Sequence, residues 1–297
     1  MLPDAVHGVR HNLSLPVRFD RSRMSLFRTW RRRRLLKRAR IDDALWQRVT
    51  ARLPFLGGMS AAELERLRSL ALLFLHEKEM HGAGGLALSD EIRLAIAVQA
   101  VLPVLNLGLD VYDGWIGVVV YPSEFRVRRQ ELDEDGVMHE WEDDLSGEAW
   151  PGGPVLLSWE DVALGVAPPE EGGEPGYNVV IHEFAHKIDM LKGEADGNPR
   201  PHADMDAGVW ERTLESAYAR LVGMVERDVE TLLDPYAAEH PAEFFAVASE
   251  TFFTDPHALQ EEFPGLYEQL KLFYRQDPAA RLAPPEKQLQ ANADKRR

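Results

Sequence analysis

The segment that most constrains this chain is His182-Glu183-Phe-Ala-His186, which has apolar residues on both sides. Residues four positions apart lie on one face of an α-helix, about 6 Å apart along its axis. Two imidazoles placed in this way can bind one Zn²⁺, and Glu183 can reach a water on that ion without binding the ion itself. The apolar neighbours predict a buried helix, in which these polar groups need a compensating partner such as a metal. The alternative is a helix with two surface histidines, and the charged Lys187 is unusual in a metal-binding helix of this kind.

A catalytic zinc site needs a third protein ligand and one open position. The metzincin spacing does not supply it, because Asp189 and Lys192 stand where that pattern requires Gly and His. Glu243 follows Pro241 near the start of a strongly apolar helix, so it is either the ligand or a first-turn partner of the helix dipole. Glu250, seven residues further on, is the alternative ligand or an acceptor for a histidine N–H, and Asp189 is a second candidate for that supporting role.

The amino-acid composition excludes several classes of protein. The chain has 297 residues, 45% of them hydrophobic, which is enough for one large domain or two small ones with a sizeable core. It has no cysteine, which rules out disulfide scaffolds, thiolate zinc ligands, iron–sulfur clusters and cysteine catalysis. No apolar run approaches the roughly 20 residues of a membrane-spanning helix, and the N-terminus lacks a signal-peptide pattern. We therefore expect a cytoplasmic protein without a membrane span.

Charge is distributed unevenly along the chain. Residues 1–40 contain 12 Lys and Arg against two acidic residues, a net of +10, so the remaining residues carry −25. An acidic body repels phosphate backbones, and we do not expect nucleic acid to be a partner. The basic run from Arg28 to Arg40 is interpreted as a solvated segment leading into the first helix. Contact of this run with acidic lipid, RNA or the protein's own acidic face is the alternative.

The order of patterns along the chain predicts an α+β protein, with a small sheet between two helical parts. Residues 1–23 lack periodicity and are expected to be a disordered tail, with Met24 as an alternative start. Ser60 and Glu63 form a capping box that opens a helix, and Ser89 starts another. The expected elements are helices over 41–53, 60–77 and 89–101, strands over 115–121, 125–129 and 155–159, a turn at 132–136, a loop at 168–176, and helices from 178 onward.

The two motifs together resemble a known family. His182-Glu-Phe-Ala-His186 is followed, 57 residues after His186, by Glu243-Phe-Phe-Ala-Val. This combination is similar to the Mlc titration factor A family of zinc-dependent peptidases and, more distantly, to the catalytic domain of anthrax lethal factor. The resemblance implies a gluzincin-like domain that is mostly helical and contains a small β-sheet. We expect residues 24–110 to be its helical N-terminal part, residues 111–275 a zincin-like catalytic part that forms one continuous domain with them, and residues 276–297 a polar C-terminal tail.

The resemblance also implies roles for single residues. One Zn²⁺ per chain is held by His182, His186 and Glu243, and a water occupies its fourth position with a pKa lowered toward ~7. Glu183 takes the proton from this water and delivers it to the leaving amine. Tyr236, seven residues before Glu243, donates a hydrogen bond to the developing oxyanion. The expected substrate is a peptide or protein, and the sequence leaves open whether the activity is that of an aminopeptidase or an endopeptidase.

A second interpretation is a regulatory protein that binds a transcriptional repressor, with the zinc domain serving mainly as a scaffold. The resemblance implies such a partner because the family is named for a member that sequesters a glucose-responsive repressor. The presence of Glu183 favours catalysis, since a scaffold needs the ligands but not the base. A purely structural zinc site is disfavoured because such sites usually have four protein ligands, often cysteines.

Overall fold

The computed structural model describes residues 21–132, 138–167, 173 and 176–283. The chain divides into two compact units, residues 1–39 and residues 40–297. The expected tail up to residue 20, most of the expected turn and loop, and the polar tail from residue 284 lie outside the described residues. Among the helices that the structure describes, none has the length and apolar character needed to cross a bilayer.

The described part of the first unit is one helix, α1 (Arg21–Arg38). It includes the last three residues of the expected tail and most of the basic run, so the expectation that this run precedes the first helix is wrong. Arginine and leucine are good helix formers, and no glycine or proline interrupts the segment. The rings of Phe27 and Trp30 stack with their centroids 6.0 Å apart, and the Arg34 guanidinium lies 5.3 Å from the Trp30 ring centroid.

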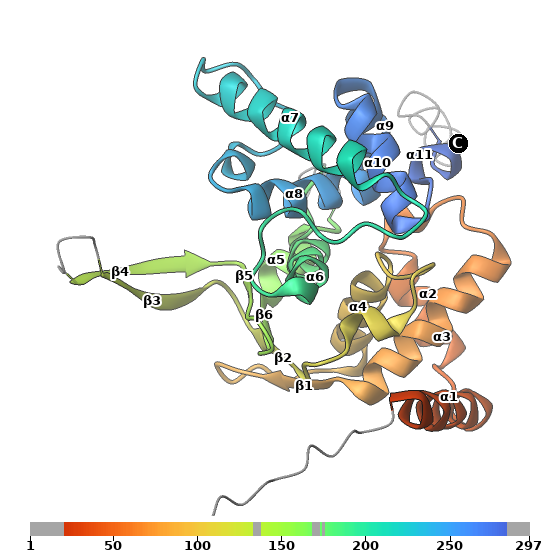
Figure 1. Cartoon of the computed structure of the whole chain (residues 1–297). Helices are drawn as coiled ribbons and strands as arrows, with labels where there is room; N and C mark the ends of the chain where they lie inside the picture. Colours follow the sequence, from red (N-terminus) through yellow and green to blue (C-terminus); the bar gives the residue numbers. More distant parts are fainter. Residues whose placement is uncertain (1–20, 133–137, 168–172, 174–175, 284–297) are drawn as a thin grey trace, which may run out of the picture. The chain divides into compact units, whose positions relative to one another are not determined.

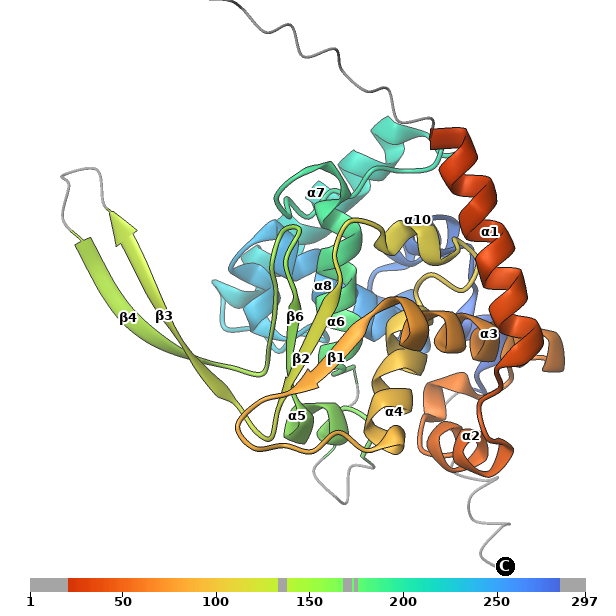
Figure 2. The same ribbon diagram turned by 90° about the horizontal axis from the view of Figure 1, so that it is seen from below.

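A four-stranded sheet forms the β layer of the second unit, in the order β1-β2-β6-β5. The first three strands of this order are parallel, and β5 pairs antiparallel with β6, so β5 lies at an edge. A separate antiparallel hairpin, β3–β4, extends away from the sheet (Figures 1 and 2). The strands are β1 (Glu79–Gly82), β2 (Gly117–Tyr121), β3 (Phe125–Leu132), β4 (Met138–Leu145), β5 (Gly147–Ala149) and β6 (Val155–Ser158).

Helices make up most of the remainder of this unit, which confirms the α+β class. The predicted capping box is present, since the Ser60 hydroxyl accepts from the Glu63 N–H and the Glu63 carboxylate accepts from the Ser60 N–H at 2.8 Å. The Ser89 hydroxyl caps the next long helix. The helices are α2 (Asp43–Thr50), α3 (Ala61–Glu77), α4 (Asp90–Val101), α5 (Trp159–Leu164), α6 (Val179–Asp189), α7 (Ala207–Val225), α8 (Pro241–Thr254), α9 (Pro256–Glu262), α10 (Pro264–Tyr274) and α11 (Pro278–Arg281).

Helix α6 carries the histidine motif and lies between the sheet and α8 (Figure 1). Its Phe184 ring is fully buried and contacts three aromatic rings, those of Phe74, Tyr112 and Trp115, at centroid distances of 5.5, 5.1 and 5.7 Å. Tilted and edge-on aromatic pairs of this kind stabilise a core beyond the area they bury. The cluster therefore fixes one side of α6, and the histidines lie on the side toward α8.

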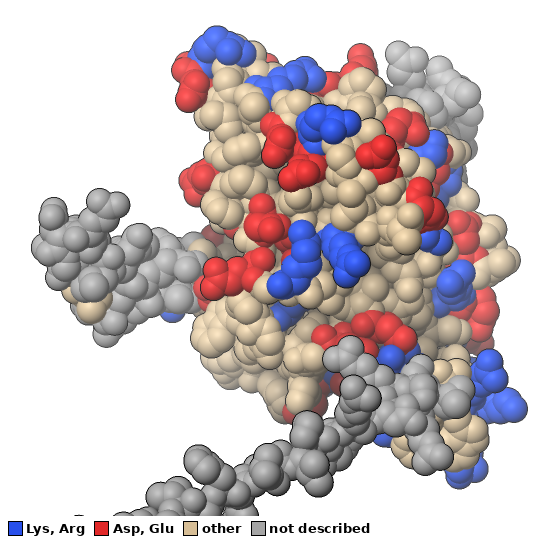
Figure 3. Space-filling model, viewed as in Figure 1, with Lys and Arg blue, Asp and Glu red and all other residues tan. Residues whose placement is uncertain are grey.

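Acidic and basic side chains are interspersed on the face of the molecule shown in Figure 3. The acidic excess of residues beyond 40 is therefore not gathered in a single patch on this face. Mixed charges of this kind are typical of a solvated surface.

Candidate metal centre

Two helix starts place the polar side chains of the site. The Asn178 side chain caps α6 by accepting from the Ile181 N–H at 2.9 Å, so the helix begins one turn before His182. Pro241 occupies the first turn of α8, where its missing N–H costs no hydrogen bond. Helices α6 and α8 pack against each other, and this packing brings Glu243 to the histidines.

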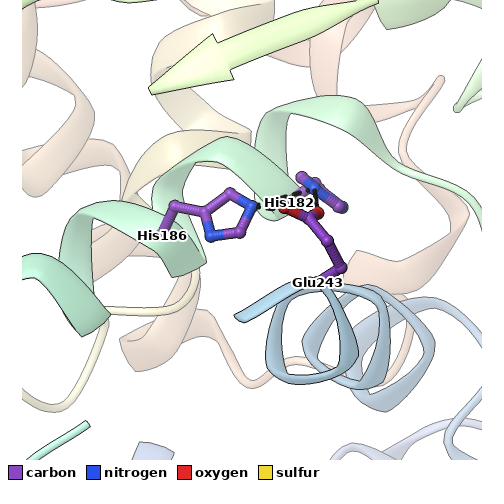
Figure 4. Close-up of side chains that lie close together, drawn as sticks. All are labelled: His182, His186 and Glu243. Carbon is purple, nitrogen blue, oxygen red and sulfur yellow. Dashed lines mark hydrogen bonds and ion pairs between the residues drawn. The ribbon is translucent and has the colours of Figure 1, made fainter. Parts of the chain in front are cut away.

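Three ligand atoms from these helices meet at one point (Figure 4). The Nε2 atom of His182 lies 3.1 Å from Nε2 of His186 and 3.0 Å from Oε2 of Glu243. The Nε2 atom of His186 lies 3.3 Å from the same carboxylate oxygen. Ligands bound tetrahedrally to zinc at 2.0–2.1 Å are about 3.3 Å apart. The three atoms are thus close to the spacing that such an ion requires.

Glu250, the alternative ligand, lies behind His182 instead of in this group. Its Oε1 atom is 2.7 Å from Nδ1 of His182, and its Oε2 atom accepts from the Asn178 N–H. A carboxylate in this position orients the imidazole, and it would direct the Nε2 lone pair toward a metal held by the three ligand residues. The arrangement corresponds to the supporting role that was the alternative prediction for Glu250.

Asp189, the other supporting candidate, is also buried but is bonded elsewhere. Its Oδ2 atom accepts from the Gly197 N–H at 2.7 Å, which ties the end of α6 to the following loop. The Nδ1 atom of His186 and the Oδ1 atom of Asp189 have no hydrogen-bond partner among the described residues. The structure thus provides a bonded carboxylate behind His182 but none behind His186.

Glu183 is buried next to the histidines, with 4% of its surface exposed. Burial raises its pKa to about 7, although the neighbouring histidines act in the opposite direction. Its Oε2 atom has no partner in the part of the chain that the structure describes. An unsatisfied buried carboxylate oxygen is costly, and it fits a site in which a water or a metal supplies the missing contact.

The electrostatics of the ligand residues favour the binding of a cation, either a proton or a metal ion. Burial acts to raise the pKa of Glu243, but hydrogen bonds with His182 and His186 outweigh it and hold this pKa far below its ordinary value. Burial likewise acts to lower the pKa of His182, and the carboxylates of Glu250 and Glu243 outweigh it and raise that pKa well above its ordinary value. Without a metal, the site therefore attracts a proton, which a metal ion must displace.

A cavity of about 380 Å³ opens beside His182 and Glu183. Tyr236 is 45% exposed and lines this cavity, with its ring centroid 6.4 Å from that of His182. Sequence reasoning found His182, Glu183, Tyr236 and Glu250 among the lining residues and missed the others. The missed residues are Leu145, Ser146, Gly147, Gly176, Tyr177, Val179, Thr231, Leu232, Asp234, Val247 and Thr251.

The donor set fits a divalent metal of the zinc type. Two imidazole nitrogens and one carboxylate oxygen are ligands that zinc prefers, and a closed structural site would fill the fourth position with a further protein ligand. Here Glu183 is buried beside the ligand atoms instead, and a cavity is lined by His182 and by Glu183. An H-E-x-x-H helix joined by a glutamate from a second helix is the arrangement typical of the metallopeptidase class.

Comparison with known proteins narrows the class to one family. Residues 27–275 match the glucose-regulated metallo-peptidase M90 family, and the chain belongs to that family. It is 40% identical over 241 residues to Mlc titration factor A of Pectobacterium atrosepticum, covering 80% of this chain and 88% of that protein. It is 38% identical over 232 residues to Mlc titration factor A of Yersinia pestis, covering 77% of this chain and 84% of that protein.

Proposed function

We propose that this protein is a zinc-dependent peptidase. The observation that carries the proposal is the convergence of His182, His186 and Glu243 to within 3.0–3.3 Å, next to a buried glutamate with an unsatisfied oxygen. These three residues would hold the ion. Zinc bound there would polarise the peptide carbonyl and make a water acidic enough to attack it near neutral pH.

The chain's own residues would carry the protons and orient the substrate. Glu183 accepts the proton of the attacking water and transfers it to the nitrogen of the leaving amine, so the carboxylate is regenerated in each cycle. Burial keeps the proton affinity of Glu183 close to that of a base working at neutral pH. Tyr236 donates its hydroxyl proton in a hydrogen bond to the oxyanion that develops on the carbonyl oxygen.

Strand β5 would align the substrate. It lies at an edge of the sheet and lines the cavity through Gly147, beside Glu183. An extended peptide can add to such an edge through main-chain hydrogen bonds. A peptide bound in this way would lie along the wall of the cavity that His182 and Glu183 line.

The test is metal content together with hydrolysis of a peptide library by the full chain. Glu183→Gln is expected to retain stoichiometric zinc and to lose hydrolysis by several orders of magnitude, because the ligands remain and the base is gone. His182→Ala is expected to lose both zinc and hydrolysis. The exposed Glu215→Gln in α7 is the matched control and should behave as wild type. Hydrolysis by Glu183→Gln at the wild-type rate would contradict the proposal.

The name of the relatives supports a second role, in regulation. By that name, the proteins of Pectobacterium and Yersinia titrate Mlc. We propose that this chain also binds a transcriptional repressor, in the cytoplasm, whether or not it cleaves one. Pull-down of a repressor by Glu183→Gln with the same affinity as by wild type would separate binding from catalysis. Failure of both forms to bind a repressor from the same organism would exclude this role.

A further inference from the structure

Lys187, the charged residue that is unusual in the motif, is almost completely buried, with 3% of its surface exposed. Its Nζ atom donates hydrogen bonds to the carbonyl oxygens of Trp150 at 2.6 Å and Gly153 at 2.8 Å. The same atom lies 4.9 Å from the centroid of the Trp115 ring, a cation–π contact. A buried ammonium group with three partners links α6 to the segment that it contacts.

That segment is the turn that joins β5 to β6. The Gly153 N–H donates to the Trp150 carbonyl at 3.0 Å, and the Trp150 N–H donates to the Pro154 carbonyl at 3.1 Å. Lys187 therefore bonds to the closed end of the β5–β6 hairpin. Because β5 is an edge strand, it has a strand partner on one side only, and the bonds from Lys187 supply a second attachment for this end of it.

The other end of β5 touches Glu183. A Cβ atom added to Gly147 would lie 2.5 Å from Oε1, 2.8 Å from Cγ and 2.9 Å from Cδ of Glu183. These distances are too short for any real side chain, so the carboxylate occupies the space that a larger residue would take. Glu183 and Lys187 are four residues apart and lie on the same side of α6. One strand is thus held against one side of the helix at two points.

We propose that Gly147 and Lys187 are positioning residues, which together hold β5 at the distance from α6 that sets the place of the Glu183 carboxylate beside the metal ligands. Lys187 fixes the turn, and Gly147 leaves room for Glu183 at the opposite end of the strand. Neither residue touches the metal or the substrate's reacting atoms. The inference rests on the proposed function only in that Glu183 is the base of the reaction.

Gly147→Ala is the direct test, and Gly117→Ala in β2 is its matched control. A Cβ atom at Gly117 would meet only the Pro154 side chain, at an ordinary 3.9 Å. We expect Gly147→Ala to fold, to retain stoichiometric zinc and the visible spectrum of the cobalt-substituted site, and to lose about 100-fold in kcat with little change in KM. Gly117→Ala should match wild type in folding, zinc content, cobalt spectrum, kcat and KM. Unchanged kcat, or loss of zinc, in Gly147→Ala would overturn the proposal.

Lys187→Met tests the other attachment, with Lys192→Met, in the 3₁₀ turn that follows α6, as control. We expect Lys187→Met to retain zinc and to lose roughly tenfold in kcat, and Lys192→Met, whose ammonium group contacts Asn198 and Asp196 and not the β5–β6 turn, to keep the wild-type kcat. Because both residues act through Glu183, the double variant with Gly147→Ala should lose less than the product of the two single effects. A loss of kcat in the double variant equal to the product of the two single losses would overturn the shared role of Gly147 and Lys187. If Lys187→Met does not fold, Gly147→Ala still decides the question.

A wild type that binds zinc but hydrolyses no peptide would refute the proposed function and not this inference. In that case a crystal structure of Gly147→Ala replaces the kinetic measurement. A displaced Glu183 carboxylate with His182, His186 and Glu243 in place would support the positioning role. A carboxylate in its original place beside Ala at position 147 would refute it.

Discussion

Replacing Glu250 with Gln tests the carboxylate behind the metal ligands without changing its shape. Each oxygen of Glu250 accepts one hydrogen bond, Oε1 from His182 Nδ1 at 2.7 Å and Oε2 from the Asn178 N–H. A glutamine has one carbonyl oxygen, so it can satisfy only one of these donors and turns its NH₂ group toward the other. If the NH₂ group faces His182, the imidazole loses its acceptor directly. If the NH₂ group faces Asn178, the N-cap residue of α6 loses its acceptor, and the helix that carries His182 is less firmly held.

The expected loss of zinc affinity follows from the effect of such carboxylates in other metal sites. Mutation of the partner of a ligand histidine typically lowers metal affinity 10–100-fold, which is roughly 1.4–2.7 kcal/mol. Because the metal binds the folded chain, the extra stability given by saturating zinc should fall by the same amount. The unsatisfied buried donor should lower the stability of the metal-free protein by a further 1–3 kcal/mol, in order of magnitude.

The assay is competition for zinc with a chelator of known affinity, together with thermal unfolding of the metal-free and zinc-loaded protein. Glu215→Gln, an exposed substitution of the same kind, is the control. Complete loss of zinc by Glu250→Gln, as expected of Glu243→Ala, would mean that Glu250 is itself a ligand. Zinc affinity equal to that of wild type would refute the argument that its bond to His182 supports the site.

Three further predictions concern residues around the site and the N-terminus. Tyr236→Phe should keep zinc and lose roughly 10²–10³ in kcat, because an oxyanion donor is removed, and an unchanged kcat would contradict that role. Burial raises the pKa of Asp189 to about 6, so the stabilising effect of its protonated form is present below about pH 4 and is lost as the pH rises through 6. Between pH 4 and 7, the metal-free wild type should therefore lose up to roughly 3 kcal/mol of unfolding free energy relative to Asp189→Asn. Urea unfolding measures this difference, and parallel pH profiles of the two proteins would contradict it. A chain starting at Met24 should bind zinc and hydrolyse peptide as the full chain does, and loss of either would show that residues 1–23 are needed.

Local features of the fold were predictable from the sequence because neighbouring residues create them. The capping box of Ser60 and Glu63 satisfies its own N–H groups, and the pair His182 and His186 shares a face in any α-helix. Strand β5 was not predictable in this way. It has three residues, two of them Gly147 and Ala149, so neither alternation nor β-propensity marks it, and its partner β6 lies beyond a tight turn.

The choice between Glu243 and Glu250 as the third ligand could not be made from the sequence. Both residues lie on one helix, two turns apart and on nearly the same face. Only the packing of α8 against α6 decides that one meets the Nε2 atoms and the other meets Nδ1 of His182. The role of Lys187 was hidden for the same reason, because its carbonyl partners belong to a turn 34 and 37 residues earlier in the chain.

The aromatic cluster beneath α6 has a consequence for how the protein handles its metal. In small zinc domains the ion organises the fold, and the chain unfolds without it. Here the rings of Phe74, Tyr112, Trp115 and Phe184 hold the helix from the side opposite its histidines. The ligand side chains are thus held in place without an ion, and we expect a bound metal to exchange without unfolding of the chain. Protein stripped by a chelator should keep its circular dichroism spectrum and regain full zinc occupancy on addition of the ion alone, without refolding.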